Sequence, residues 1–238
     1  MLYRLIPFTL VCVAFAQQPD QQAEKAPAPP VRAGERSGAR IPLFFSETWK
    51  TVPNGGEHGV TQEQVGGASL ELKLYGPSAN QVQALGSATD PSNPPHVWTG
   101  MTTAPVAVTL RDKDNYVDLT GLARIRWQNK TSGFHQVRPV VKLADGTLLV
   151  GDHADGSPLD WHETEFSIAE VRWLKLDSSK VVTHGNFVEH PDLSKVDEVG
   201  FADLLPGSGH GPGGWFDVAL FEVYGKPVKR EGGTTTSK

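Results

Sequence analysis

The chain has 238 residues, a formal net charge of −5 and one cysteine, Cys12. Its Lys and Arg residues do not form the concentrated basic patch that nucleic-acid binding requires. Without a cysteine after Cys12, the remainder of the chain has no thiol catalysis, thiolate zinc site or disulfide. We expect its stability to come from a buried core, which a domain of this length can form.

Residues 1–16 have the composition of a signal peptide. One positive charge, at Arg4, precedes an apolar run from Leu5 to Phe15, and Ala14 and Ala16 give the small–x–small pattern before a cleavage site. The run has about half of the roughly 20 residues that span a bilayer as a helix. The residues just before Cys12 are not the small ones that lipidation needs. We therefore expect cleavage after Ala16 and a secreted or periplasmic protein without stable membrane insertion.

Two polar segments flank the predicted folded unit. Residues 17–40 are rich in Gln, Ala, Pro and charge, and lack aromatic side chains. Such a segment buries too little apolar surface to offset its ordering entropy, so we predict a disordered linker. Residues 230–238 have a similar character and are predicted to be a disordered tail. This leaves one β-sandwich domain over residues 41–229.

Apolar and polar residues alternate through most of this domain, as in half-buried β-strands. The clearest case has Leu70, Leu72 and Leu74 on one face and Glu71 and Lys73 on the other. The Asp-Gly pair at 145–146 predicts a hairpin turn between two such runs. The expected strands cover residues 43–50, 69–75, 105–111, 124–128, 137–143, 148–150, 161–168, 171–177, 196–202 and 215–224.

About ten short strands separated by turn residues indicate an all-β sandwich. Helix is expected only as single turns at 167–169 and 191–195. Residues 77–96 are predicted to form a long surface loop, and residues 205–215 form a second loop with five glycines. Loops at the ends of a rigid sandwich are where binding residues are usually found.

Three segments resemble the galactose-binding-like jelly rolls, a fold that many carbohydrate-binding modules share. These are 118–127 (DLTGLARIRW), 160–174 (DWHETEFSIAEVRWL) and the pair 196–201 (VDEVGF) and 216–225 (FDVALFEVYG). The resemblance covers roughly residues 118–228. It implies a single-domain, jelly-roll-type antiparallel β-sandwich, and it implies the fold more strongly than any ligand.

The resemblance also implies a structural calcium ion between the first and last strands. The matching positions are Glu47 and Asp217, whose carboxylates, with backbone carbonyls, would supply the oxygen ligands that Ca²⁺ prefers. In the alternative interpretation both are ordinary outward-facing strand residues.

No catalytic pattern is evident. The eight histidines lack the spacings of zinc sites, and Ser208 lacks the surrounding pattern of a nucleophile elbow. Glu163 and Glu165 are alternate residues on one strand face, as acids are in some sandwich hydrolases, but ordinary exposed acids explain them as well.

The tryptophans give the most specific prediction of a ligand site. Trp127 alternates with polar neighbours and is predicted to be in the core. Trp98 follows the long Pro-rich loop, and Trp215 closes the Gly-rich loop that has His210 at its middle. We predict that Trp98, His210 and Trp215 bind ligand, because a flat ring beside a polar donor suits a sugar. Alternatively, each ring holds its loop against the sandwich.

The leading hypothesis is therefore a secreted, non-catalytic binding module whose partner is carbohydrate, including cell-envelope glycan. One alternative is a glycan-active hydrolase or lyase on a sandwich scaffold. The other is a structural envelope protein without a small ligand.

Overall fold

A computed structural model of the chain describes residues 40–51, 58–156, 159–208 and 213–231. The predicted signal peptide, residues 17–39 of the predicted linker, residues 232–238 of the predicted tail and His210 lie outside the described residues. Within the described ranges, no helix has the length and apolarity needed to cross a bilayer.

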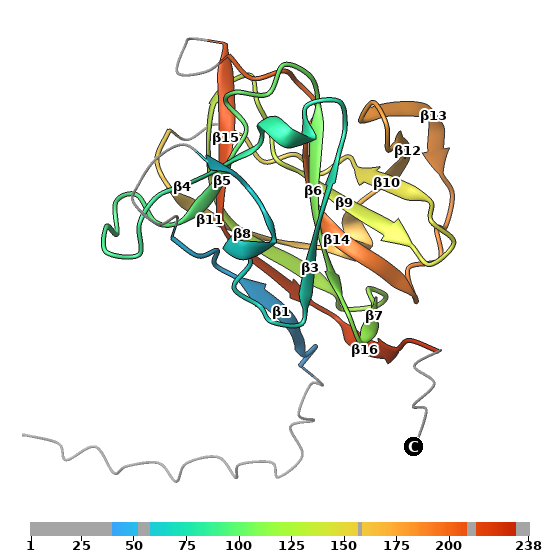
Figure 1. The fold of residues 1–238 in the computed structure, drawn as a ribbon. Coiled ribbons are helices and arrows are strands. Elements are labelled where there is room, and N and C mark those ends of the chain that lie inside the picture. The colour runs from blue at the N-terminus through green and yellow to red at the C-terminus, as the bar shows by residue number, and fades with distance from the viewer. Residues whose placement is uncertain (1–39, 52–57, 157–158, 209–212, 232–238) are drawn as a thin grey trace, which may run out of the picture. The chain divides into compact units, whose positions relative to one another are not determined.

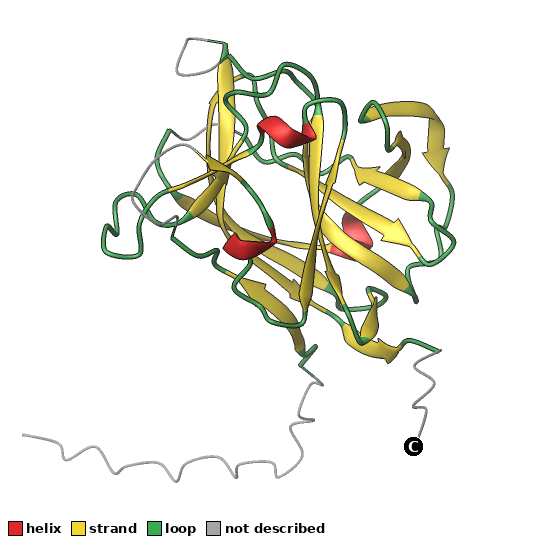
Figure 2. Cartoon of the chain, viewed as in Figure 1, coloured by secondary structure: helices red, strands yellow, loops and turns green. Residues whose placement is uncertain are grey.

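The predicted fold class is confirmed: the domain is an all-β, jelly-roll-type sandwich of two antiparallel sheets (Figures 1 and 2). Sheet A contains β1 (Leu43–Glu47), β2 (His58–Gly59), β4 (Gln83–Leu85), β5 (His96–Trp98), β8 (Arg124–Gly133), β11 (His162–Ser167) and β15 (Gly214–Tyr224). Its order is β11-β8-β15-β5-β4-β2, and β1 also pairs with β15.

Sheet B has the order β13-β12-β10-β9-β14-β6-β3, and β7 joins β16 to β14. Its strands are β3 (Leu70–Tyr75), β6 (Val106–Asp112), β7 (Asn115–Asp118), β9 (Arg138–Leu143), β10 (Leu148–Gly151), β12 (Trp173–Asp177), β13 (Val182–Val188), β14 (Val196–Asp203) and β16 (Lys226–Lys229). The described residues thus form sixteen strands where about ten were expected, because several short strands lack an alternating pattern.

The core lies between the sheets, where alternate residues of both face inward. On sheet A the inward set includes Trp127 of β8 and Phe216, Val218 and Phe221 of β15, all buried. The prediction that Trp127 is a core residue is confirmed, and its Nε1 donates to Asp155 Oδ2 at 2.9 Å.

Helix is limited to the 3₁₀ turns η1 (Gln62–Gln64), η2 (Ala79–Gln81) and η3 (Ile168–Glu170) within the described residues. The turn expected at 167–169 corresponds to η3. The one expected at 191–195 is wrong: Asp192 instead accepts hydrogen bonds from the backbone and hydroxyl of Ser194, and a bend leads into β14. The segment 77–96 is not one long surface loop, because it contains η2, β4 and the first residue of β5.

Candidate binding site

The structure places Trp98, Trp215 and Asp217 together on the outward face of sheet A. Asp217 and Trp215 alternate with the inward-facing Phe216 and Val218 on β15. The register pairs Asp217 with Trp98 on β5 and with Lys130 on β8, which brings side chains from three strands to one patch.

Lys130 lies at the centre of this patch. Its Nζ is 3.2 Å from Asp217 Oδ2, 4.6 Å from the centroid of the Trp161 ring and 5.5 Å from that of Trp215. Both indole rings therefore lie within cation–π distance of the same ammonium group. Ammonium groups are attracted to indole rings at such distances, by about 0.5–1 kcal/mol where exposed and more where water is excluded.

His96 completes what we call the tryptophan–lysine cluster: Trp161, Lys130, Asp217, Trp215 and His96. The His96 ring packs edge-on against Trp161, with centroids 5.2 Å apart, and its Nε2 is 3.4 Å from Asp217 Oδ1. Trp161 Nε1 donates to Ser92 O at 3.2 Å, which holds the ring over His96. Trp161 and Trp215 are half-buried, so each leaves part of its indole accessible.

Burial shifts the pKa values of Asp217 and His96, the two titratable groups beneath the rings. Asp217 is 2% exposed, and desolvation raises the pKa of its carboxyl to about 7, although the Lys130 ammonium acts in the opposite direction. Desolvation lowers the pKa of His96 to about 4, and Lys130 lowers it further, against the effect of the hydrogen bond to Pro94.

The prediction that Trp98 presents its ring to a ligand is wrong. The side chain is 3% exposed, and its ring lies against Gly100, where an added Cβ atom would be 2.0 Å from the nearest ring atom. Trp98 therefore supports the patch from below. Of the predicted ligand-binding residues, Trp215 remains accessible, while His210 is outside the described residues.

The structure contradicts a calcium ion shared by Glu47 and Asp217. Glu47 pairs with Phe221, a core residue four positions beyond Asp217, so Glu47 faces the core side of sheet A whereas Asp217 faces outward. Glu47 instead accepts hydrogen bonds from the backbone N–H groups of Trp49, Gly66 and Gly67, at 2.7, 2.8 and 3.1 Å.

No three His, Cys, Asp or Glu side chains of the described residues converge to hold a metal. Calcium binding as such stays a prediction.

Beyond the tryptophan–lysine cluster, the same face of sheet A continues as a groove and then as a row of ion pairs. The groove has a volume of about 360 Å³; Gln128 and Leu220 lie on its sheet side, with Trp49, Pro94 and Pro95 around them. At the far end, Arg126 pairs with Glu163 and Glu222, and Arg124 pairs with Glu165 at 3.1 Å.

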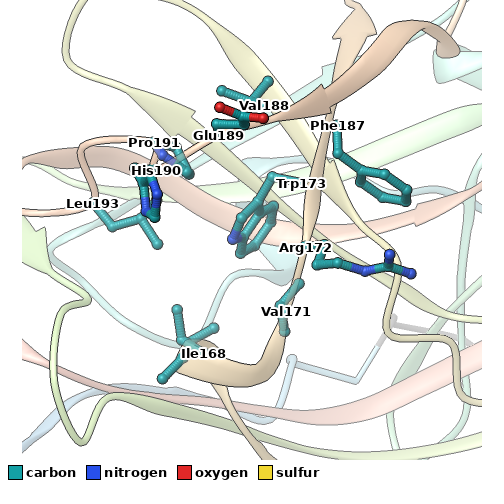
Figure 3. A pocket seen from close by; sticks show the side chains of 11 residues that line it. Ile168, Val171, Arg172, Trp173, Phe187, Val188, Glu189, His190, Pro191 and Leu193 are labelled. Atoms are coloured by element: carbon teal, nitrogen blue, oxygen red, sulfur yellow. The ribbon is translucent and has the colours of Figure 1, made fainter.

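A second cavity, of about 640 Å³, lies at the edge of sheet B between η3 and the end of β13 (Figure 3). Its apolar lining includes Trp173, which is buried, and Val188. The Arg172 guanidinium is already engaged: it bonds to Asp152 at 2.7 Å and lies 4.3 Å over the Phe187 ring. The lining also includes the exposed polar side chains of Glu189 and His190.

Sequence reasoning missed Trp161, Lys130 and His96. These residues come from different strands, and only the pairing of β15 with β5 and β8, and of β8 with β11, brings them together. The tryptophan count was the one available signal, because it exceeded what the core could fully bury.

No protein-family model matches the chain, and no curated protein is similar to it in sequence. Among solved structures, the family 11 carbohydrate-binding module of the cellulosomal cellulase Lic26A-Cel5E of Clostridium thermocellum is 14% identical, with a TM-score of 0.41 over 81% of this chain and 99% of that one.

The module TmCBM61, solved with β-1,4-galactotriose, is 10% identical, with a TM-score of 0.36 over 67% of this chain and 90% of that one. The carbohydrate recognition domain of Emp47p is 9% identical, with a TM-score of 0.39 over 79% and 98%. These three solved structures are thus two carbohydrate-binding modules and one carbohydrate recognition domain.

Proposed function

We propose that this protein binds glycan, without catalysis, on the outward face of sheet A. The observation that carries the proposal is the pair of half-buried indoles, Trp161 and Trp215, that both lie close to the Lys130 ammonium group. A pyranose has an apolar face that stacks on a flat ring and a rim of hydroxyls that needs polar partners. The tryptophan–lysine cluster supplies both, on strands rather than on a loop, so that the contacts are pre-positioned.

The adjoining groove supports a ligand longer than one sugar. Gln128 is one alternate position from Lys130 on β8, and Gln128 lies on the sheet side of the 360 Å³ groove. An oligosaccharide that stacks on the cluster would extend along β8 and β15 into this groove. The side-chain amide of Gln128 offers both a donor and acceptors to hydroxyl groups.

The arrangement of acids favours binding over glycoside hydrolysis. Hydrolysis needs two carboxyl groups facing each other across the scissile bond, one of them protonated. Glu163 and Glu165 are exposed, lie on one strand and are each paired with an arginine. Asp217 has a raised pKa, but its nearest charged neighbour is Lys130 and not a second carboxylate.

The predicted signal peptide at residues 1–16 completes the proposal. A protein exported to the periplasm or the exterior would meet cell-envelope glycans or free polysaccharide there. Mass spectrometry of the exported protein should give Gln17, or the pyroglutamate that forms from it, as the first residue; a mass that retains Met1 would contradict export by cleavage.

A glycan array tests the proposed function. The purified chain should bind a defined subset of glycans, and a double Trp161→Ala, Trp215→Ala variant should lose that binding. Large aromatic side chains dominate the energetics of interfaces, so the loss of both rings should remove most of the affinity. The matched control is Phe187→Ala, which truncates an exposed ring beside the cavity in Figure 3. If Phe187→Ala abolishes binding while the double variant retains it, the site is on sheet B instead.

A further inference from the structure

The hydrogen bonds of His96 fix where its proton lies. Its Nδ1 is 2.7 Å from the carbonyl oxygen of Pro94, which can only accept, so Nδ1 carries a proton. In the neutral imidazole, Nε2 then has a lone pair and no proton. That lone pair faces Asp217 Oδ1 across 3.4 Å.

Two lone pairs that face each other in a buried site repel, so a proton is needed between them. Oδ1 of Asp217 is fully buried and accepts no hydrogen bond, as expected of the oxygen that carries the proton of a neutral carboxyl group. The raised pKa of Asp217, about 7, and the lowered pKa of His96, about 4, place that proton on the carboxyl below neutral pH.

A neutral Asp217 leaves the charge of Lys130 without compensation. The titratable and charged groups that face Asp217 are His96 from β5 and Lys130 from β8. Further along the same sheet face, Arg126 is paired with Glu163 and Glu222. The tryptophan–lysine cluster then presents one cation, one-fifth exposed, with two half-buried indoles close to it.

We propose that the ligand of this site is an anionic glycan, whose carboxylate or sulfate binds Lys130 beside the two indoles, and that ionisation of Asp217 weakens this binding by competing for Lys130. This inference rests on the proposed glycan binding and names its ligand class. In the opposing interpretation, Lys130 and Asp217 are a permanent ion pair that only holds β8 to β15, and the ligand is neutral.

The test uses an array that carries uronate, sulfated and neutral glycans, followed by titration calorimetry with the best anionic oligosaccharide. Both anions keep their charge across the pH range used, so any pH dependence comes from the protein. Affinity should fall about tenfold between about pH 5.5 and about pH 8.5, as Asp217 ionises. Asp217→Asn should remove most of this decrease and retain the stronger binding at the higher pH.

Lys130→Met should lose anionic ligands about tenfold or more at both pH values, whereas Lys130→Arg should retain them. Melting curves of each variant show whether the fold is intact. If the wild-type chain binds only neutral glycans, the anionic ligand is wrong while glycan binding stands. If no glycan of any class binds, the proposed function itself fails. Preference for sulfated or uronate ligands identifies the anion.

Discussion

Buried polar side chains connect segments of this fold through hydrogen bonds, and Glu47 is the clearest case. Its carboxylate is fully buried yet satisfied by three backbone N–H groups, from Trp49 and from the Gly66–Gly67 turn. A carboxylate with three such donors needs no metal ion to compensate for its burial. Glu47 therefore ties the end of β1 to the segment that leads into β3.

Glu47→Ala should destabilise the domain by about 3 kcal/mol or more, because it leaves three N–H groups without an acceptor. Urea unfolding followed by tryptophan fluorescence measures this loss. Glu165→Ala removes a half-exposed carboxylate from the same sheet, and we expect a change below about 1 kcal/mol. Equal effects of the two variants would show that the buried hydrogen bonds of Glu47 contribute little.

Asp217 gives a second residue-scale prediction, on pH. The folded chain keeps the Asp217 proton up to about pH 7, whereas an unfolded Asp loses its proton near about 3.9. The folded state binds more protons in this window, so the contribution of Asp217 to stability falls as pH rises from about 4 to about 7. Asp217→Asn lacks this decrease, and its stability relative to the wild type should rise over the same window.

The wild type must be compared with Asp217→Asn because His96 changes the stability in the opposite direction as pH rises. Its folded pKa is lowered to about 4 from about 6.5 in the unfolded state, so its contribution increases with pH between these values. In the wild type, the pH-dependent contributions of Asp217 and His96 to stability largely cancel. The contribution of Asp217 becomes visible only in the stability difference between the wild type and Asp217→Asn. A difference in melting temperature that stays constant from about pH 4 to about pH 7 would contradict the raised pKa of Asp217.

At the scale of single residues, the sequence predicted correctly that Trp127 is in the core. It did not show which tryptophan rings face the ligand. Trp98 and Trp215 both border loops, and nothing local distinguishes the buried ring from the accessible one. Trp161 was predicted only as the start of a strand. The difference is set by non-local pairing: Trp98 lies beside Asp217 under the patch, whereas Trp161 lies above His96.

At the element scale, alternation predicted the strands that have one inward and one outward face. The runs at 69–75, 105–111 and 196–202 correspond closely to β3, β6 and β14. β13 was missed because its residues are nearly all exposed, so no apolar period marks it. β4 and the first residue of β5 were assigned to a loop, because three-residue strands between prolines and glycines lack room for a period.

The strand β14 is packed so closely against its neighbour that it requires glycine at position 200. A Cβ atom there would lie 2.0 Å from the carbonyl oxygen of Val108 on β6. Gly200→Ala should destabilise the domain by about 3 kcal/mol, since backbone must move to accept the methyl group. Gly59→Ala is the matched control in β2, where the nearest atom would be 3.7 Å away; calorimetric melting should show almost no change for it. A mild effect of Gly200→Ala would mean that β14 and β6 separate easily.

For the whole molecule, the two outward faces differ in what they leave accessible. Sheet B carries a second, buried apolar cluster that includes Val140, Val150 and Ala202, and loops and neighbouring strands cover it. Sheet A carries the tryptophan–lysine cluster, a groove and paired charges. The sandwich itself could be predicted from the sequence, because period-two runs and turn residues are local. Which outward face carries the candidate site could not be predicted from the sequence, since this depends on the register of β15 with β5 and β8.

The central claim is that ligand binds on the outward face of sheet A. Its most direct test is a titration of the ¹⁵N-labelled chain with the best glycan from the array, observed at the indole N–H resonances and assigned by single Trp→Phe variants. The resonances of Trp161 and Trp215 should shift with saturation, while those of Trp127 in the core and Trp173 beside the sheet B cavity should stay in place. Shifts at Trp173 with none at Trp161 and Trp215 would contradict the account.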